Sequence, residues 1–378
     1  MRPLQGIRVL DFSTLLPGPM ATLVLAEAGA EVLKIERPGR GDEMRSYEPK
    51  FSADSVNFAL LNRGKRSIAC DMKDPDVVRQ LLALAREADI VIEQFRPGVM
   101  DRLGLGYDAM KAANPKIIYC AITGWGQDGP NRDLAAHDLN YVAETGMLGL
   151  SAGADGAPVV PPALIADIAG GTYPALVNIL LALRQRDQTG EGCKLDIAMA
   201  DNLFPFMYWA IGNARAAAQW PAPGGELVTG GSPRYQIYRT ADGRFLAAAP
   251  LEDKFWGQFL QAIGARATLE RESGSAAATR AAVQELIGAK TAAHWAQAFQ
   301  GLDVCCTVVP TLEEALANPH FAARRLFDHG LRDDDGQRID ALPVPVDARF
   351  RASPADAPYP GLGEANADWG FAPTDHPR

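Results

Sequence analysis

Residues 6–36, GIRVLDFSTLLPGPMATLVLAEAGAEVLKIE, are the stretch that decides the fold class. Residues 6–12 form an apolar run of strand length, and residues 20–29 have helical spacing that ends at a glycine. Residues 31–36 form a second apolar run, so the stretch predicts a strand, a helix and another strand. Strands that alternate with helices imply a parallel sheet covered by helices on both faces.

The turn after the first predicted strand argues against a dinucleotide cofactor. The strand-helix-strand unit imitates a dinucleotide-binding fold, down to an acidic residue, Glu36, at the end of its second strand. The turn reads Leu-Leu-Pro-Gly-Pro at residues 15–19, however, and lacks the glycine pattern that lets a backbone contact a pyrophosphate. A nicotinamide cofactor is therefore not expected.

The same alternation continues along the first part of the chain. Further strands are predicted at residues 66–71, 88–93, 116–121 and 194–199, and helices at residues 74–87 and 171–185. We therefore predict an α/β fold, with a Rossmann-like parallel-sheet large domain at residues 1–220.

A break in composition predicts a second domain. Residues 220–233 are rich in glycine and proline, which is typical of a domain boundary. Residues 235–249 then contain a hairpin signal around Ala-Asp-Gly, followed by helical patterns. We predict a smaller α+β domain at residues 221–325 and a C-terminal segment at residues 326–378, rich in proline, alanine and glycine, that wraps a surface.

Composition excludes several functional classes. A chain of 378 residues is too long for one ordinary core, and its net charge of -9 argues against an extended nucleic-acid surface. The 5 cysteines are scattered without a C-x-x-C pair, which predicts free thiols in a reducing compartment and no metal site. Because no signal peptide and no uninterrupted apolar run of membrane-spanning length is found, we expect a cytoplasmic protein without a membrane partner.

A histidine and an aspartate are the candidate catalytic residues. His137 lies in a polar, turn-rich setting, and Asp167 precedes two glycines and a helical pattern. An imidazole titrates near neutrality and a carboxylate can be tuned towards it, so the two together can move protons. Each also has an ordinary explanation, because a lone histidine is more often structural and an aspartate before a helix is a common cap. We expect the two side chains to face each other across a substrate.

Seven motifs occur in an order that resembles a known family. They are residues 15–19 (LLPGP), 35–38 (IERP), 61–66 (LNRGKR), 96–98 (RPG), 123–127 (TGWGQ), 137–141 (HDLNY) and 166–171 (ADIAGG). Together they resemble the family III CoA-transferases, also called the CaiB/BaiF family, and within it the α-methylacyl-CoA racemases. The resemblance covers nearly the whole chain. It implies an acyl-CoA substrate with no other cofactor, a C-terminal segment that returns to the large domain, and a homodimer of two interlocked chains.

The resemblance also implies roles for the candidate residues. Asp167 would be the nucleophile of a transferase, forming an acyl anhydride and then a CoA thioester, or an acid/base of a racemase. His137 is typical of the racemases; it would work on one face of the α-carbon and Asp167 on the other, with a helix-start N–H at the enolate oxygen. Glu252 matches a glutamate near that histidine, although a helix N-terminal acid fits nearly as well. Asp138 is expected to fix the local backbone, and Ala136, where racemases usually have glycine, is a minor change.

The phosphates of CoA need guanidinium or ammonium partners, and its adenine needs an apolar slot. The residues in segments that contact CoA in relatives are Arg37, Leu61, Lys65, Phe95, Arg96, Met100 and Arg102, with Tyr141 at the pantetheine thioester end. Each basic residue alone is typical of a solvated surface charge. Together, however, they lie at the ends of predicted strands, where such sheets bind ligands, and this supports a CoA-binding role for the set.

Three hypotheses about function follow. The favoured one is an α-methylacyl-CoA racemase or epimerase that abstracts a proton α to the thioester. The alternative is a CoA-transferase that moves CoA between an acyl-CoA and a carboxylic acid through an aspartyl-CoA thioester. The third is a catalytically silent CoA-binding protein. His137, Glu252 and the shortage of consecutive glycines at residues 224–231 favour the first hypothesis, and the intact Asp167 and His137 count against the third.

Overall fold

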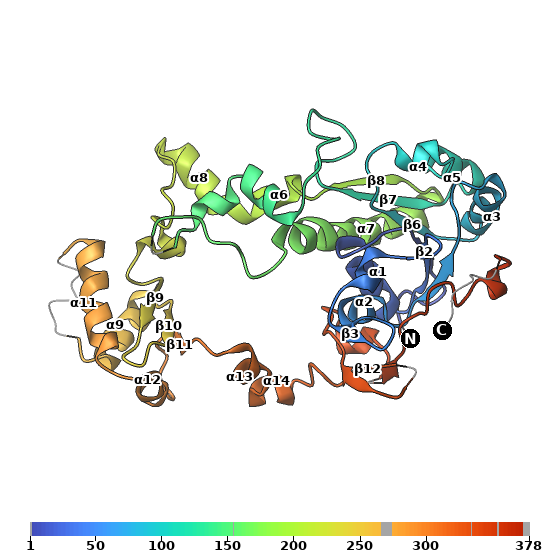
Figure 1. Cartoon of the computed structure of the whole chain (residues 1–378). Coiled ribbons are helices and arrows are strands. Elements are labelled where there is room, and N and C mark those ends of the chain that lie inside the picture. Colours follow the sequence, from blue (N-terminus) through green and yellow to red (C-terminus); the bar gives the residue numbers. More distant parts are fainter. Residues whose placement is uncertain (1, 154, 266–273, 334, 354, 373–378) are drawn as a thin grey trace. The chain divides into compact units, whose positions relative to one another are not determined.

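The computed structural model describes residues 2–153, 155–265, 274–333, 335–353 and 355–372. The chain divides into two compact units, whose elements are labelled in Figure 1. The first unit contains Met1–Thr145, Pro161–Pro205 and Arg324–Arg378, and the second contains Gly146–Val160 and Phe206–Ala323. The domain limits expected after residues 220 and 325 stay a prediction.

A six-stranded sheet of order β5-β2-β1-β6-β7-β8 is the framework of the first unit. Its strands are β1 (Arg8–Asp11), β2 (Glu31–Glu36), β5 (Arg66–Ala69), β6 (Ile90–Glu93), β7 (Ile118–Thr123) and β8 (Lys194–Ala198). All neighbouring strands are parallel, which confirms the predicted sheet and its six strands. The chain adds β2 and β5 on one side of β1 and the later strands on the other. A topological switch point therefore lies between β1 and β6, where α/β sheets bind ligands.

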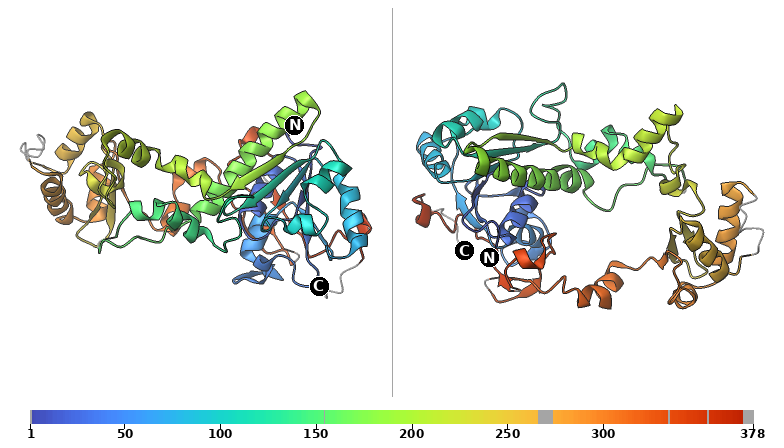
Figure 2. Two further views of the ribbon diagram at one scale, coloured as in Figure 1. Left: turned by 90° about the horizontal axis from the view of Figure 1, so that it is seen from above. Right: turned by 180° about the vertical axis from the view of Figure 1, so that it is seen from behind.

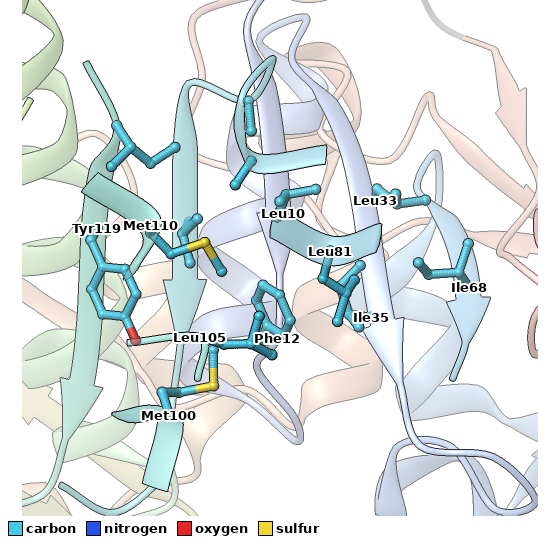
Figure 3. Close-up of a cluster of buried hydrophobic side chains, with 14 of the residues drawn as sticks. Leu10, Phe12, Leu33, Ile35, Ile68, Leu81, Met100, Leu105, Met110 and Tyr119 are labelled. Carbon is cyan, nitrogen blue, oxygen red and sulfur yellow. The ribbon is translucent and has the colours of Figure 1, made fainter. Parts of the chain in front are cut away.

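Helices cover both faces of this sheet, as seen in Figure 2. Helices α3 (Pro75–Ala85) and α5 (Tyr107–Ala113) pack on one face, where Leu10 and Leu33 belong to the buried cluster of Figure 3. Helices α1 (Pro17–Glu27) and α7 (Tyr173–Thr189) pack on the other face. There the Thr22 hydroxyl of α1 donates to the Asp11 carboxylate at 2.5 Å. Because both faces are covered, successive strand residues are buried in both directions.

Two short elements not predicted from the sequence surround the end of β7. The π-helical turn η3 (Ala166–Thr172) leads into α7, and α6 (Asp138–Glu144) packs against it. A Cβ on Gly170 would lie 2.3 Å from the carbonyl oxygen of Met199, so only glycine lets this turn approach the residue after β8. π-Helical turns occur frequently at functional sites.

The C-terminal part of the first unit packs beside β5. Strands β12 (Gly330–Arg332), β13 (Arg338–Asp340) and β14 (Asp356–Ala357) form a small sheet. The Asn366 amide accepts a hydrogen bond from the backbone N–H of Ala69 at 2.8 Å and donates to its carbonyl at 3.0 Å. The smaller elements of this unit are η1 (Glu43–Ser46), β3 (Lys50–Phe51), β4 (Asp54–Ser55), α2 (Val56–Asn62), α4 (Val99–Arg102), η4 (Asp201–Met207, which runs into the second unit), η6 (Ala348–Phe350) and η7 (Ala367–Trp369).

The second unit has its own sheet and core. Its antiparallel strands are β9 (Gln236–Arg239), β10 (Phe245–Ala248) and β11 (Cys306–Val308), which confirms the predicted hairpin. Its helical elements are η2 (Met147–Leu150), α8 (Tyr208–Ala217), η5 (Leu227–Gly231), α9 (Asp253–Ala262), α11 (Ala276–Gly288), α12 (Ala292–Ala298), α13 (Leu312–Leu316) and α14 (Pro319–Ala323). Trp256, Phe259 and Trp295 are among the side chains of its core.

One helical segment, Ala166–Thr189, is long and apolar enough to cross a membrane by length and composition. Half of its most apolar stretch is buried within the structure. Core helices of folded proteins can be equally long and apolar. Its apolar character is therefore weak support for a membrane span.

Candidate active site

A pocket of about 430 Å³ lies in the first unit at the carboxyl ends of β1, β6 and β7. Three parts of its wall follow the strands: Thr14, Leu15 and Pro17 after β1, Gln94–Pro97 after β6, and Ile122–Trp125 at the end of β7. The rest of the wall consists of Arg132, Leu134–His137, Asn140, Tyr141, Asp167 and Met199. This is the topological switch point of the sheet, where a ligand can reach loops from several strands at once. A second pocket, lined by residues before β6 and β7, includes none of the predicted site residues.

Asp167 lies in η3 with its side chain on the pocket wall. Its backbone N–H donates to a carboxylate oxygen of Asp138 at 2.9 Å, which fixes the turn against α6. Burial and, second to it, the negative charge of Asp138 together raise the pKa of Asp167 from 3.8 to about 7. A carboxyl group with this pKa is present in both protonation states near neutrality, which suits an acid/base.

His137 immediately precedes α6 and lines the same pocket. Its backbone N–H donates to the side-chain oxygen of Asn140 at 3.0 Å, and its carbonyl accepts from the Asn140 N–H at 2.8 Å. The side chain itself is exposed to solvent. The structure thus brings His137 and Asp167, from two different elements, to one pocket. Their catalytic roles stay a prediction.

An aromatic pair also lines this pocket. The Tyr141 ring meets Trp125 edge to face with the ring centroids 5.0 Å apart, and its hydroxyl donates to the Ala136 carbonyl at 3.0 Å. Burial raises the pKa of Tyr141, and the nearby carboxylates of Asp167 and Asp138 add to the shift, so the phenol stays neutral. A Cβ on Gly124 would lie 2.3 Å from the Tyr141 ring, which explains the glycine.

The residues predicted to bind CoA divide into two groups. Phe95, Arg96 and Tyr141 are on the pocket wall. Arg37 and Arg102 are exposed outside that wall; Arg37 donates to the Gly41 carbonyl at 2.9 Å and pairs with Glu43 at 2.9 Å. Their exposed guanidinium groups remain accessible to an anionic ligand. Binding of CoA by these residues stays a prediction.

The other three predicted CoA contacts are interior. Leu61 is 6% exposed and Met100 is 3% exposed, and Met100 lies in the core cluster of Figure 3. The Lys65 ammonium donates to the Asn62 side chain at 2.8 Å and the Pro19 carbonyl at 2.9 Å, and lies 3.4 Å from the Asp11 carboxylate. Burial lowers the pKa of Lys65 to about 7. The structure therefore places these side chains inside the fold, not on the pocket wall.

Glu252 belongs to the second unit. It occupies the N-cap position of α9 and its side chain is exposed. An acid there interacts favourably with the helix dipole, so the local structure supplies an ordinary reason for it. Its role beside His137 stays a prediction.

Several pocket residues were not proposed from the sequence. The Gln94 side chain accepts from the backbone N–H of Gly18 at 3.1 Å and so joins the turns after β1 and β6. Trp125 belongs to the quoted TGWGQ motif, but no role was assigned to it. The sequence does contain a signal for both Gln94 and Trp125. Each follows a predicted parallel strand, and the carboxyl ends of such strands meet at one edge of the sheet. Among the described residues, no group of three or more His, Cys, Asp or Glu is placed to hold a metal ion.

The raised pKa of Asp167 predicts how it affects stability. Because this pKa rises from 3.8 in the unfolded chain to about 7 in the folded one, the fold is destabilised as pH rises from about 4 to 7. Asp167→Asn cannot ionise and is expected to raise the melting temperature relative to wild type at pH 8. At pH 4, where the carboxyl is protonated, the difference should be small. Thermal unfolding at both values measures it; a difference that is equal at both pH values contradicts the assignment.

The chain is similar to known proteins over nearly its whole length. A model of CoA-transferase family III matches residues 4–366. An α-methylacyl-CoA racemase from Homo sapiens is 33% identical, over 96% of this chain and 91% of that protein. A succinate–glutarate CoA-transferase from Agrobacterium fabrum is 35% identical, over 97% of this chain and 94% of that protein. A crystal structure of a CAIB/BAIF family protein from Brucella suis superposes with a TM-score of 0.80 at 30% identity, covering 97% and 98% of the two chains.

Proposed function

The chain belongs to CoA-transferase family III, and on that premise we propose that it is an α-methylacyl-CoA racemase or epimerase. Both racemases and CoA-transferases are among its relatives at similar identity, so similarity prefers neither activity. The observation that supports racemisation is that His137 and Asp167 line one pocket from different elements. Two acid/base groups around one carbon are what inversion beside a thioester requires.

The proposed reaction is a proton transfer through an enolate. Neutral His137 removes the α-proton from one face, and protonated Asp167 delivers a proton to the other face. The reverse direction uses the Asp167 carboxylate as base and the His137 imidazolium as acid. A backbone N–H at a helix start is proposed to hold the enolate oxygen. The pKa of about 7 for Asp167 supports this scheme, because either protonation state is then accessible near neutrality.

The alternative is CoA transfer, favoured by the CoA-transferase relatives and by the carboxylate on the pocket wall. The Asp167 carboxylate would attack the thioester carbonyl and release the CoA thiolate, which leaves an acyl anhydride. The thiolate would then attack the aspartyl carbonyl, giving an aspartyl-CoA thioester and the free acid. An incoming carboxylate would reverse these two steps. This chemistry needs Asp167 ionised but assigns no proton transfer to His137.

Deuterium exchange separates these activities. The protein is incubated with one enantiomer of a 2-methylacyl-CoA in deuterated water, without an acceptor acid. Deuterium at the α-carbon together with loss of optical purity supports racemisation, and failure to exchange across several chain lengths refutes it. CoA that moves to an added carboxylate, with hydroxylamine trapping at Asp167, supports transfer instead. Tight CoA binding with neither outcome supports the silent binding protein.

The substrate site is proposed to hold CoA, with no cofactor beyond it. Arg96 supplies a positive charge at the pocket, and Phe95 supplies an apolar surface next to it. Arg37 and Arg102 are proposed partners for the phosphates, because a guanidinium group can bind a phosphate with two hydrogen bonds. Tyr141 is proposed at the thioester end, consistent with its place near Asp167.

A homodimer of interlocked chains is the proposed assembly. One side of α7 packs on the sheet, while Val177, Leu180 and Leu181 on the other side are 56%, 49% and 63% exposed. Apolar residues gathered on one exposed face are typical of a protein interface. We propose that a second copy of the chain covers them. We also propose that Glu252 lies near His137, supplied by the same chain or by the second copy.

Replacing Leu181 with Glu is therefore expected to weaken the dimer, because a charge would be buried without a partner. Sedimentation velocity across a concentration series measures the change. Gln188→Glu is the matched control, since it adds the same charge at an exposed polar position of the same helix. A wild-type chain that stays monomeric at every concentration contradicts the proposed assembly.

A further inference from the structure

Leu15 is a strained residue on the wall of the pocket. Its φ is +62°, in the left-handed region that non-glycine residues rarely adopt. Leu15 lines the pocket together with Thr14 and Pro17. Without tertiary constraints, an L-residue populates this region roughly tenfold less than an ordinary backbone conformation. Such a conformation persists only where the surrounding structure enforces it.

A buried ion pair between Lys34 and Asp42 holds Leu15 in this conformation. Both carboxylate oxygens of Asp42 accept from the Leu15 N–H, at 3.1 and 3.2 Å. The Lys34 ammonium lies 3.0 Å from the Asp42 carboxylate and donates to the carbonyl of Ser13 at 2.7 Å. Both charged side chains are 0% exposed. The pair therefore holds the backbone on both sides of Thr14, although neither Lys34 nor Asp42 is on the pocket wall.

The pair is itself held in place by its surroundings. The backbone N–H of Asp42 donates to the Glu36 carboxylate at 2.9 Å, and that carboxylate pairs with Arg45 at 2.7 Å. Burial disfavours the ammonium of Lys34, but the carboxylates of Asp42, Asp11 and Glu36 outweigh it and raise the pKa of Lys34. Lys34 therefore carries its positive charge at neutral pH. Because the anchors of the ion pair are β2 and the loop after it, the pair can impose its geometry on the turn after β1.

We propose that Lys34 and Asp42 are positioning residues for the acyl-CoA site, which hold Leu15 in the left-handed conformation that shapes the pocket wall. The identity of the ligand rests on the proposed function. Without the pair, the turn relaxes towards ordinary backbone angles and the fraction of binding-competent molecules falls. The apparent affinity for the ligand falls by the same fraction.

A double-mutant cycle tests this role with CoA as the probe. Asp42→Asn is expected to raise the Kd for CoA roughly tenfold in a chain with Leu15. In the Leu15→Gly background the same change is expected to have less than a threefold effect, because glycine adopts positive φ without strain. The readout is therefore the coupling between the two positions, which isothermal titration calorimetry measures. Equal effects in both backgrounds show a general structural role and overturn the proposal.

Two further variants keep the test valid if Asp42→Asn folds poorly. Lys34→Met combined with Asp42→Asn removes both charges, so no uncompensated ammonium is left in the interior. It is expected to show the same dependence on Leu15→Gly. Asp54→Asn is the matched control, because Asp54 pairs with Arg45 at 2.7 Å in the adjoining network and is not on the pocket wall. Its Kd for CoA should change less than threefold, and a tenfold change would contradict the proposal.

Hydrogen exchange distinguishes failure of this inference from failure of the proposed function. The Leu15 amide is expected to be protected in the wild-type chain and at least tenfold less protected in Asp42→Asn, with or without ligand. If the wild-type chain binds no CoA, the proposed function is refuted, while protection that depends on Asp42 still supports the positioning role. Unchanged exchange over residues 13–17 in Asp42→Asn overturns that role even where CoA binds.

Discussion

Asp167→Asn is expected to abolish both deuterium exchange and CoA transfer, lowering kcat on the order of 10²- to 10⁴-fold. The amide keeps the size of the side chain and the backbone N–H that donates to Asp138 at 2.9 Å, so the pocket should keep its shape. It cannot ionise, deliver a proton or form an anhydride. Binding of CoA, measured separately by calorimetry, should change little.

Asp138→Asn is the matched comparison for this prediction, because it leaves the Asp167 carboxyl in place. Burial remains, but the negative charge that raises the pKa of Asp167 is removed, so this pKa should fall below about 7. The acidic limb of the kcat/KM profile, where Asp167 ionises, should therefore move to lower pH. Retention of more than a tenth of wild-type activity by Asp167→Asn would contradict a catalytic role for the carboxyl group.

His137→Ala is expected to remove deuterium exchange, again on the order of 10²- to 10⁴-fold, while CoA binding is retained. The side chain is exposed on the pocket wall, and the contacts that fix the start of α6 are made by its backbone and by Asn140. The fold should therefore tolerate the change. Melting temperature and CoA affinity measured beside the exchange rate separate a lost proton acceptor from a damaged helix.

This variant also decides between the two activities of the family. A transferase whose nucleophile is Asp167 has no proton for His137 to remove, so CoA transfer should survive His137→Ala. His320→Ala is the control, since His320 is exposed on α14 and lies in the second unit. Full exchange by His137→Ala would remove the imidazole from the mechanism and leave Asp167 as the remaining proposed acid/base.

The framework of the first unit could be predicted because its signals are local. Each strand is a short apolar run, and parallel strands buried on both faces need such runs regardless of their neighbours. The turn at η3 was not predicted as a π-helical element. Its glycines are visible in the sequence, but the carbonyl of Met199 that makes Gly170 necessary comes from another part of the chain.

Sequence alone determined the parallel α/β sheet, the family and the choice of His137 and Asp167, because these depend on apolar periodicity and on ordered motifs. Only tertiary structure decided that Lys65 is interior, that Asp167 titrates near neutrality and that Leu15 is held at positive φ. The physical reason is that burial and charge arise from residues distant in the chain. The partner of the Asp167 N–H is 29 positions away, and that of the Leu15 N–H is 27 positions away.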